Sequence, residues 1–195
     1  MADAINRAGS LQNAPPSLIR LHRLVWIALM AALTGVGGLL AIPINPFSPA
    51  PITLQTMFVL LAGLILGSRA AAWAMLLYLL AGILGLPVFA GGRAGLAVFF
   101  GPTGGFLLGF VPAAMFCGLA KKEPVRSFLS VMGFCLVATA ITLALGSIQL
   151  CLVLKISFVK ALLVGVVPFL PGGLLKCLAA VSIYRFLAIN KLLRL

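Results

Sequence analysis

The stretch from Gly85 to Gly105 combines the apolarity of a membrane span with the glycine and proline content of a loop. In the hydrocarbon region of a bilayer, irregular backbone persists only where it is buried in protein or lines a cavity, because unpaired N–H and C=O groups are costly there. Apolar stretches flank this segment on both sides. The sequence therefore predicts a pocket between membrane-spanning helices, and a pocket in a small membrane protein indicates a site for a solute.

The composition identifies the class of protein that surrounds this segment. The chain has 195 residues, of which 63% are hydrophobic and 8% are charged, whereas a soluble domain is roughly half apolar and a quarter charged. A helix needs about 20 residues to cross the bilayer core, so the chain accommodates about six spans. We predict an all-α integral membrane protein with a disordered cytoplasmic tail over residues 1–20 and a transmembrane domain over residues 21–195.

The expected spans are separated by three irregular connections. The segment 43–51 contains four prolines and is expected to be a stiff connector. The Gly-rich segment and a partly basic turn that begins at Lys155 are the other two connections. The expected spans cover residues 24–42, 52–67, 70–84, 104–120, 128–154 and a last segment that ends near residue 189 and is interrupted at Pro168 and at Pro171 to Gly173.

The basic residues indicate the orientation in the membrane. The chain has 14 Lys and Arg against 2 Asp and Glu, but the cations lie at span ends, which favours cytoplasmic retention and anionic lipid over nucleic acid. With both termini in the cytoplasm, the three irregular connections lie outside and frame an outward-opening site. The inner cations are then Arg7, Arg20, Arg23, Arg69, Lys121, Lys122, Arg126, Arg185, Lys191 and Arg194, and the outer ones are Arg93, Lys155 and Lys160.

Lys176 is the candidate with the strongest physical argument. An ionisable side chain within a span is costly and indicates a functional site. The two acidic residues, Asp3 and Glu123, are both expected in the cytoplasm, so neither neutralises Lys176. Freed backbone carbonyls, water or an anionic solute remain as its partners. The alternative is a lysine whose long side chain reaches the membrane surface.

Polar residues at the outer ends of the spans are further candidates for solute binding. Thr53 and Gln55 follow the proline-rich connector, and capping or helix–helix hydrogen bonding is their structural alternative. Thr103 and Gly104 begin the fourth span, where Thr103 is expected to cap the helix and free N–H groups can receive an anion. Arg93 is the only charge in the Gly-rich segment; it would select an anionic solute or contact lipid headgroups.

The sequence lacks the residue patterns that metal binding, redox chemistry or catalysis would require. The four cysteines are scattered without metal-ligand or redox spacing, and the single histidine, His22, lies beside two arginines at the membrane surface. We find no nucleophile–base pair, so no catalytic residue, metal ligand or cofactor is expected. A helix-packing subunit without a ligand remains an alternative to a solute-binding protein.

Three motifs give the chain a family resemblance. They are Pro49-Ala-Pro-Ile-Thr-Leu-Gln-Thr56, the run from Tyr78 through Gly85-Leu-Pro-Val-Phe-Ala-Gly-Gly92, and Gly101-Pro-Thr-Gly-Gly-Phe-Leu-Leu-Gly109. In this order and spacing they resemble the BioY family, the biotin-specific substrate-binding (S) components of energy-coupling factor (ECF) transporters. The similarity extends from about Leu24 to Leu187.

The resemblance implies a six-helix S-component fold in the bacterial cytoplasmic membrane that binds biotin in an outward-facing pocket. The predicted substrate-binding residues are Thr53, Gln55, Tyr78, Phe89, Gly91, Arg93, Thr103, Gly104, Phe106 and Lys176. The resemblance also implies a transmembrane coupling protein, which would contact Ala28 and Ala32, and a pair of ABC-type ATPases. ATP hydrolysis is expected from these partners, since the chain carries no nucleotide-binding motif.

One position departs from the family pattern. Members of the family commonly have Pro-Gly-Asp followed three residues later by Lys, whereas this chain has Gly173 in place of the aspartate and keeps Lys176. A lost charge-assisted hydrogen bond of roughly 1.5–3 kcal/mol would weaken biotin by about one to two decades. Phe106 likewise replaces a tyrosine common in the family. A ring-plus-carboxylate vitamin such as lipoate is therefore an alternative substrate.

Overall fold

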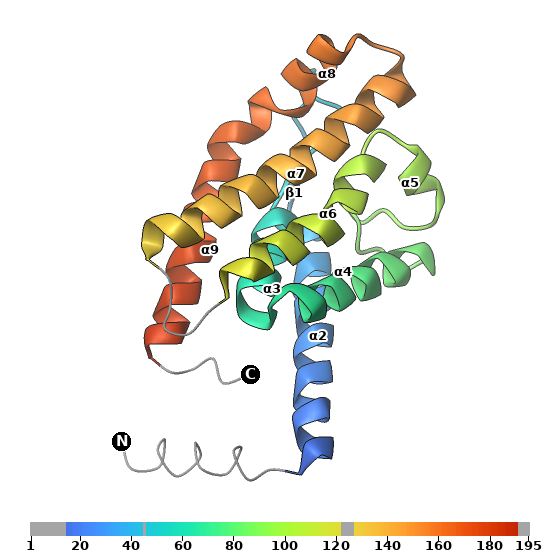
Figure 1. The fold of residues 1–195 in the computed structure, drawn as a ribbon. Coiled ribbons are helices and arrows are strands. Elements are labelled where there is room, and N and C mark those ends of the chain that lie inside the picture. Colours follow the sequence, from blue (N-terminus) through green and yellow to red (C-terminus); the bar gives the residue numbers. More distant parts are fainter. Residues whose placement is uncertain (1–14, 45, 122–126, 191–195) are drawn as a thin grey trace.

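The computed structural model describes residues 15–44, 46–121 and 127–190, and this part of the chain forms a helical bundle (Figure 1). Three helical segments are long and apolar enough to cross a membrane, namely Pro16–Leu39, Phe128–Leu154 and Phe158–Ile189. Three shorter apolar segments, Gln55–Leu66, Ser68–Ile83 and Gly104–Ala120, lie where the second, third and fourth spans are expected. The predicted all-helical architecture is therefore confirmed for the described residues, apart from one short strand pair.

The elements follow the predicted order. Their bounds are α2 (Pro16–Leu39), β1 (Ala41–Ile42), β2 (Ile52–Thr53), α3 (Gln55–Leu66), α4 (Ser68–Ile83), α5 (Ala97–Phe100), α6 (Gly104–Cys117), η1 (Gly118–Ala120), α7 (Phe128–Leu154), α8 (Phe158–Gly165), η2 (Val167–Phe169) and α9 (Leu170–Ile189). The strands β1 and β2 pair antiparallel, with Ala41 opposite Thr53. This pairing, which the sequence did not predict, joins the two ends of the proline-rich connector. It places Thr53 just before the N-terminus of α3.

The first helix corrects one predicted boundary. Helix α2 begins at Pro16, so residues 16–20 are helical and do not belong to a disordered tail. Proline suits the start of a helix because its fixed φ is helical and its missing N–H has no partner there in any case. Residues 1–14 of the predicted tail lie outside the described residues.

The last predicted span is broken into α8, η2 and α9. Pro168 lies within the first two residues of η2, and Pro171 lies within the first two residues of α9. The predicted interruption at Pro168 is confirmed. The expectation for Pro171 to Gly173 is wrong in detail, because these residues form the first turn of α9 and do not interrupt it.

Glycines let α6 pack closely against α7. A β-carbon at Gly105 would overlap the carbonyl oxygen of Leu145, and one at Gly146 would overlap the ring of Phe106. At Gly109 it would lie 3.0 Å from the α-carbon of Thr142. Because small residues allow backbones to approach, α6 and α7 run side by side in Figure 1. This contact brings Phe106 and Thr142 to the same region of the bundle.

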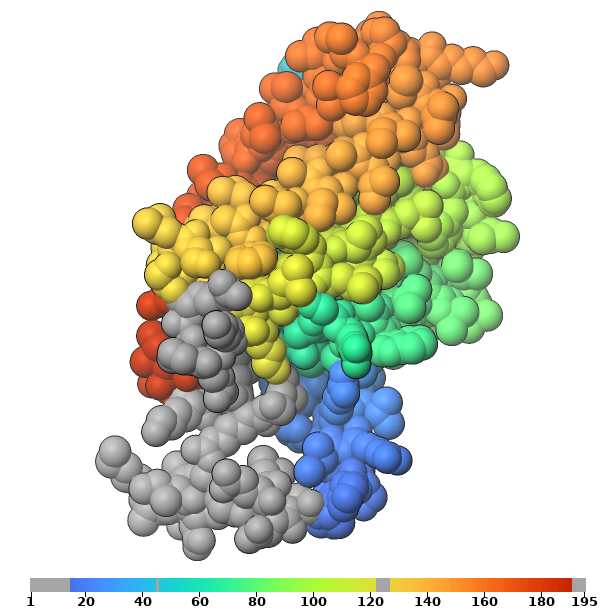
Figure 2. Space-filling view, viewed as in Figure 1, coloured from blue at the N-terminus to red at the C-terminus, as the bar shows by residue number. Residues whose placement is uncertain are grey.

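Among the described residues, helix α2 is buried only along its C-terminal part. Its buried residues begin at Ile27, and Figures 1 and 2 show its N-terminal half, in blue, extending beyond the other helices. The predicted docking residues, Ala28 and Ala32, are both exposed. Gly37 and Gly38, by contrast, pack inside the chain, where a β-carbon on Gly38 would lie 2.7 Å from Gln55 Nε2.

Candidate ligand-binding site

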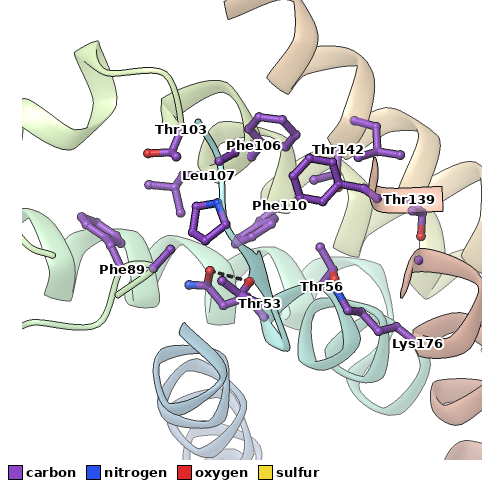
Figure 3. Close-up of a pocket in the computed structure, with 17 residues that line it drawn as sticks. Thr53, Thr56, Phe89, Thr103, Phe106, Leu107, Phe110, Thr139, Thr142 and Lys176 are labelled. Atoms are coloured by element: carbon purple, nitrogen blue, oxygen red, sulfur yellow. Dashed lines mark hydrogen bonds between the residues drawn. The ribbon is translucent and has the colours of Figure 1, made fainter. Parts of the chain in front are cut away.

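One cavity opens between the proline-rich connector and helices α3, α6, α7 and α9 (Figure 3). Its empty space, opening included, is about 680 Å³, far more than the roughly 30 Å³ that one water molecule takes up in the liquid. The lining residues are Ala50, Pro51, Thr53, Gln55, Thr56, Phe89, Ala90, Thr103, Phe106, Leu107, Phe110, Thr139, Thr142, Leu143, Phe169, Gly173 and Lys176. The pocket predicted beside the Gly-rich segment is therefore present.

The first turn of α3 supplies the most connected polar group of the cavity. Thr53 Oγ1 donates a hydrogen bond of 3.1 Å to Gln55 Oε1, and Gln55 Nε2 donates to the hydroxyl oxygen of Tyr78. The Tyr78 hydroxyl also lies 3.4 Å from the carbonyl oxygen of Val88. Tyr78 is buried and does not line the cavity. Its hydroxyl therefore orients the Gln55 amide without itself facing the cavity. Thr53 and Gln55 present the polar atoms to the cavity.

Aromatic rings form the apolar walls. Phe106 on α6 packs against Phe169 with their ring centroids 5.8 Å apart, and Phe89 packs edge-on against Tyr78 at 5.7 Å. Phe110 is tilted against Tyr78 with a centroid distance of 6.2 Å. Figure 3 shows the rings of Phe106 and Phe110 in the same part of the cavity. Such surfaces suit a flat apolar ring or an aliphatic chain.

The start of α6 differs from its predicted role. Thr103 is the N-cap residue, but its side chain makes no capping hydrogen bond, so the capping prediction is wrong. Its hydroxyl is buried and has no hydrogen-bond partner among the described residues. Because a buried unpaired hydroxyl is unfavourable, a bound ligand or water is expected to satisfy it.

Gly104 is a packing residue. A β-carbon at this position would overlap the carbonyl oxygen of Phe99 and lie 2.5 Å from Gln149 Nε2. Gln149 on α7 donates hydrogen bonds to the carbonyl oxygens of Phe99 and of Gly101, the latter at 2.8 Å. Gly104 itself does not line the cavity; it lets Gln149 bind the turn that carries Thr103.

Lys176 extends from α9 into the cavity. It is half-buried, and in Figure 3 its side chain runs toward Thr56 on α3. Of the described residues that line the cavity, it alone is charged. The two acidic residues of the chain, Asp3 and Glu123, both lie outside the described residues.

Gly173 lies one turn before Lys176 and also lines the cavity. A β-carbon added to Gly173 would lie 3.6 Å from Thr139 Cγ2, an ordinary van der Waals contact. The position therefore has room for the first atom of a side chain.

Two predicted site residues lie nearer the surface. Gly91 and Arg93 line a neighbouring hollow, which shares Pro51 and Ala90 with the cavity. Arg93 is exposed, and its Nε donates a hydrogen bond of 3.1 Å to the carbonyl oxygen of Ala90. These residues are placed beside the cavity and not within it.

Sequence reasoning missed the contribution of α7. Thr139 and Thr142 line the cavity, although neither was among the predicted site residues. The sequence could have indicated them, because two threonines three positions apart in a mostly apolar helix lie on one face. Phe110 and Phe169 were also missed, and nothing distinguishes them in the sequence from the other phenylalanines.

Comparisons with known proteins agree with this geometry. The BioY family matches residues 10–194. A biotin transporter BioY of Rhodobacter capsulatus is 40% identical over 176 residues, which cover 83% of this chain and 90% of the relative. A probable biotin transporter BioY of Pyrococcus horikoshii is 38% identical over 157 residues, or 80% of this chain and 90% of the relative.

A solved structure shares the fold. The crystal structure of the S-component for biotin from an ECF-type ABC transporter superposes with a TM-score of 0.82 at 29% sequence identity. The match covers 89% of this chain and 94% of the solved chain. Fold, motif order and sequence identity agree, and the chain belongs to the BioY family.

Proposed function

We propose that this chain captures biotin from outside the cell as the membrane S component of an ECF-type transporter. The observation that carries the proposal is one cavity, within a BioY-family fold, that joins the polar pair Thr53 and Gln55, phenylalanine walls and the amine of Lys176. Relatives that match most of the chain are named biotin transporters. We expect ATP hydrolysis to come from partner subunits, because the sequence contains no nucleotide-binding motif.

The cavity suits the chemistry of biotin. The molecule combines a compact bicyclic ring, a ureido group with both donors and acceptors, an aliphatic chain and a carboxylate. The rings of Phe106 and Phe110 offer apolar surface to the bicycle and chain. Hydroxyl groups of the cavity threonines and the amide of Gln55 provide donors and acceptors for the ureido group. Lys176 provides a positive charge.

In the proposed topology, the chain crosses the cytoplasmic membrane six times and both termini are cytoplasmic. The crossings would be α2, α3, α4, α6 with η1, α7, and the segment from α8 to α9. The distribution of Lys and Arg supports this orientation through the positive-inside rule. The cavity then opens to the outer side.

The proposed partners are a transmembrane coupling protein and a pair of ABC-type ATPases. Ala28 and Ala32 support the docking surface, since both are exposed and lie four residues apart on one face of α2. Side chains this small allow a partner helix to approach closely.

Lipoate is not favoured as the substrate. The relatives' names and the solved S-component refer to biotin, and no relative reported above refers to another vitamin. The replacement of the family aspartate by Gly173 then concerns how biotin is held and how tightly.

Uptake of radiolabelled biotin tests the proposal. A biotin-auxotrophic bacterium without its own transporter would express the chain together with an ECF coupling module. We expect uptake at nanomolar biotin that unlabelled biotin suppresses and excess lipoate does not. Equal suppression by lipoate, or uptake no greater than in cells with the module alone, would contradict the proposed function.

A further inference from the structure

A second hollow lies along the seam between α6 and α7, and among the described residues it shares no lining residue with the ligand cavity. Gly105 lines this α6–α7 groove, where the backbone of α6 comes close to the carbonyl oxygen of Leu145. The empty space of the groove, opening included, is about 820 Å³. Figure 1 shows α5 and the start of α6, which contribute to the groove, beside the second half of α7. The groove is therefore a candidate site separate from the cavity.

The α6–α7 groove offers apolar surface to a ligand. Of its described lining residues only Gln149 is polar, and its Nε2 already donates to the carbonyl oxygens of Phe99 and Gly101. The exposed apolar side chains along the groove are Phe100, Leu108, Leu145, Ile148, Leu152 and Val153. In the proposed topology these side chains face the outer half of the bilayer. An acyl chain suits such a surface better than a polar solute does.

Lys155 provides a positive charge at the end of the same face of α7. Ile148 and Leu152 both line the groove, and Lys155 ends the helix three residues after Leu152, on the side that these residues share. Lys155 is exposed, and the described residues include no acidic side chain that could pair with it. In the proposed topology it lies at the outer membrane surface, where lipid phosphates are found.

The backbone of Lys155 does not explain why a lysine occupies this position. Its φ of 52° and ψ of 38° place it in the left-handed region, and no other non-glycine residue in the described part of the chain has a positive φ. Side chains other than glycine rarely adopt this conformation, and glycine is the usual residue at such helix ends. A strained residue of this kind indicates a role for its side chain.

We propose that one anionic phospholipid of the outer leaflet binds here, with an acyl chain in the α6–α7 groove and its phosphate paired with Lys155. The inference depends on the proposed membrane orientation and goes beyond the capture of biotin. A second copy of this chain fits the groove less well, because its described residues offer no carboxylate to meet Lys155.

Native mass spectrometry of the purified protein tests the role of the charge. The protein is incubated in detergent with equal amounts of phosphatidylglycerol and phosphatidylcholine that carry the same acyl chains. The unaltered chain is expected to retain one phosphatidylglycerol with about fivefold preference, the effect of one lysine at a membrane surface. Lys155→Gly removes the charge at a φ that glycine adopts readily, and it should bring the ratio close to one. Lys160→Gln, at an exposed lysine of α8, is the matched control and should keep the preference.

A second pair of variants tests the groove. Ile148→Trp places a larger side chain in the groove and should lower the retention of both lipids. Leu136→Trp is its control, because Leu136 is an exposed residue of α7 that does not line the groove. It should retain both lipids as the unaltered chain does. Cooperative thermal unfolding shows that each variant is folded.

Four results would overturn the inference. The first is equal retention of the two lipids by the unaltered chain. The second is a preference that persists in Lys155→Gly, even with lower stability, since Lys155 would then only favour the end of α7. The third is full lipid retention by Ile148→Trp. The fourth is a dimer that forms in place of the lipid complex and is lost in Ile148→Trp, which would assign the groove to a second copy. Should Ile148→Trp fail to fold, the comparison of Lys155→Gly with Lys160→Gln still decides.

Discussion

Gln149 on α7 donates a hydrogen bond of 2.8 Å to the carbonyl oxygen of Gly101, in the turn that begins α6. Its amide also donates to the carbonyl oxygen of Phe99. A single side chain thus satisfies two backbone carbonyls of a loop that lies 48 to 50 residues earlier in the chain. The arrangement holds Thr103 at the edge of the cavity.

Replacing Gln149 by leucine is therefore expected to weaken both the fold and the site. The two carbonyls lose their donor, which costs about 1–3 kcal/mol for a buried unsatisfied group. Thermal unfolding and biotin titration measure the two effects. Ile148→Leu, a change at an exposed neighbour on the same helix, is the control and should alter neither. Unchanged stability in Gln149→Leu would show that the turn holds its shape without this residue.

Gly104→Ala should destabilise the protein because no space exists for a β-carbon. The added carbon would overlap the carbonyl oxygen of Phe99 and crowd Gln149 Nε2. Overpacking of this kind costs about 1–3 kcal/mol. Gly133→Ala on α7 is the matched control, because a β-carbon there meets nothing within 4 Å. Alanine favours a helix over glycine by up to about 1 kcal/mol, so the control should unfold at the same or a higher temperature. A reversed order of the two melting temperatures would contradict this packing.

Tyr78 is expected to influence ligand binding through Gln55. Tyr78→Phe removes the hydroxyl to which Gln55 Nε2 donates but leaves the cavity wall in place. Gln55→Leu removes the polar atoms that face the cavity. The biotin affinities of both single variants and the double variant form a double-mutant cycle. If Tyr78 acts through Gln55, the double variant binds biotin as weakly as Gln55→Leu alone. Additive losses would indicate an independent role for Tyr78.

The exposed alanines of α2 give a prediction about partners. Ala28→Trp and Ala32→Trp add bulk to a face that the described chain leaves uncovered. We expect normal biotin binding by the purified protein but at least a tenfold loss of uptake in cells, because a bulky side chain prevents close helix approach. Ala140→Trp, at an exposed position of α7, is the control and should support normal uptake. Full uptake by both α2 variants would place the docking surface elsewhere.

The sequence predicted most of the fold because the signals for membrane helices are strong and local. Apolar runs separated by prolines and glycines located every long helix, and the bounds of α7 agree with Phe128–Leu154. The start of α2 was placed too late, since Arg20, His22 and Arg23 make the first turns unlike a span although they belong to the helix. The pairing of β1 with β2 depends on a contact across the proline-rich connector, which no local pattern encodes.

The site was predictable only in part, for a related reason. Thr53, Gln55, Thr103 and Lys176 are polar groups in apolar surroundings, and such contrasts are visible in a sequence. Which phenylalanines face the cavity depends on how α6 packs against α7 and η2, and that packing follows from three-dimensional contacts such as Gly146 with Phe106. Gly104 was predicted as a site residue, whereas the structure gives it a packing role next to the cavity.

Titration of the purified, ligand-stripped protein with biotin, and in parallel with lipoate, tests the central claim most directly. We predict saturable binding of one biotin per chain with no measurable binding of lipoate. Biotin at 100 times its dissociation constant should also stabilise the folded protein by roughly 2.7 kcal/mol. Protein that unfolds cooperatively yet binds lipoate in preference to biotin, or binds neither, would contradict the account.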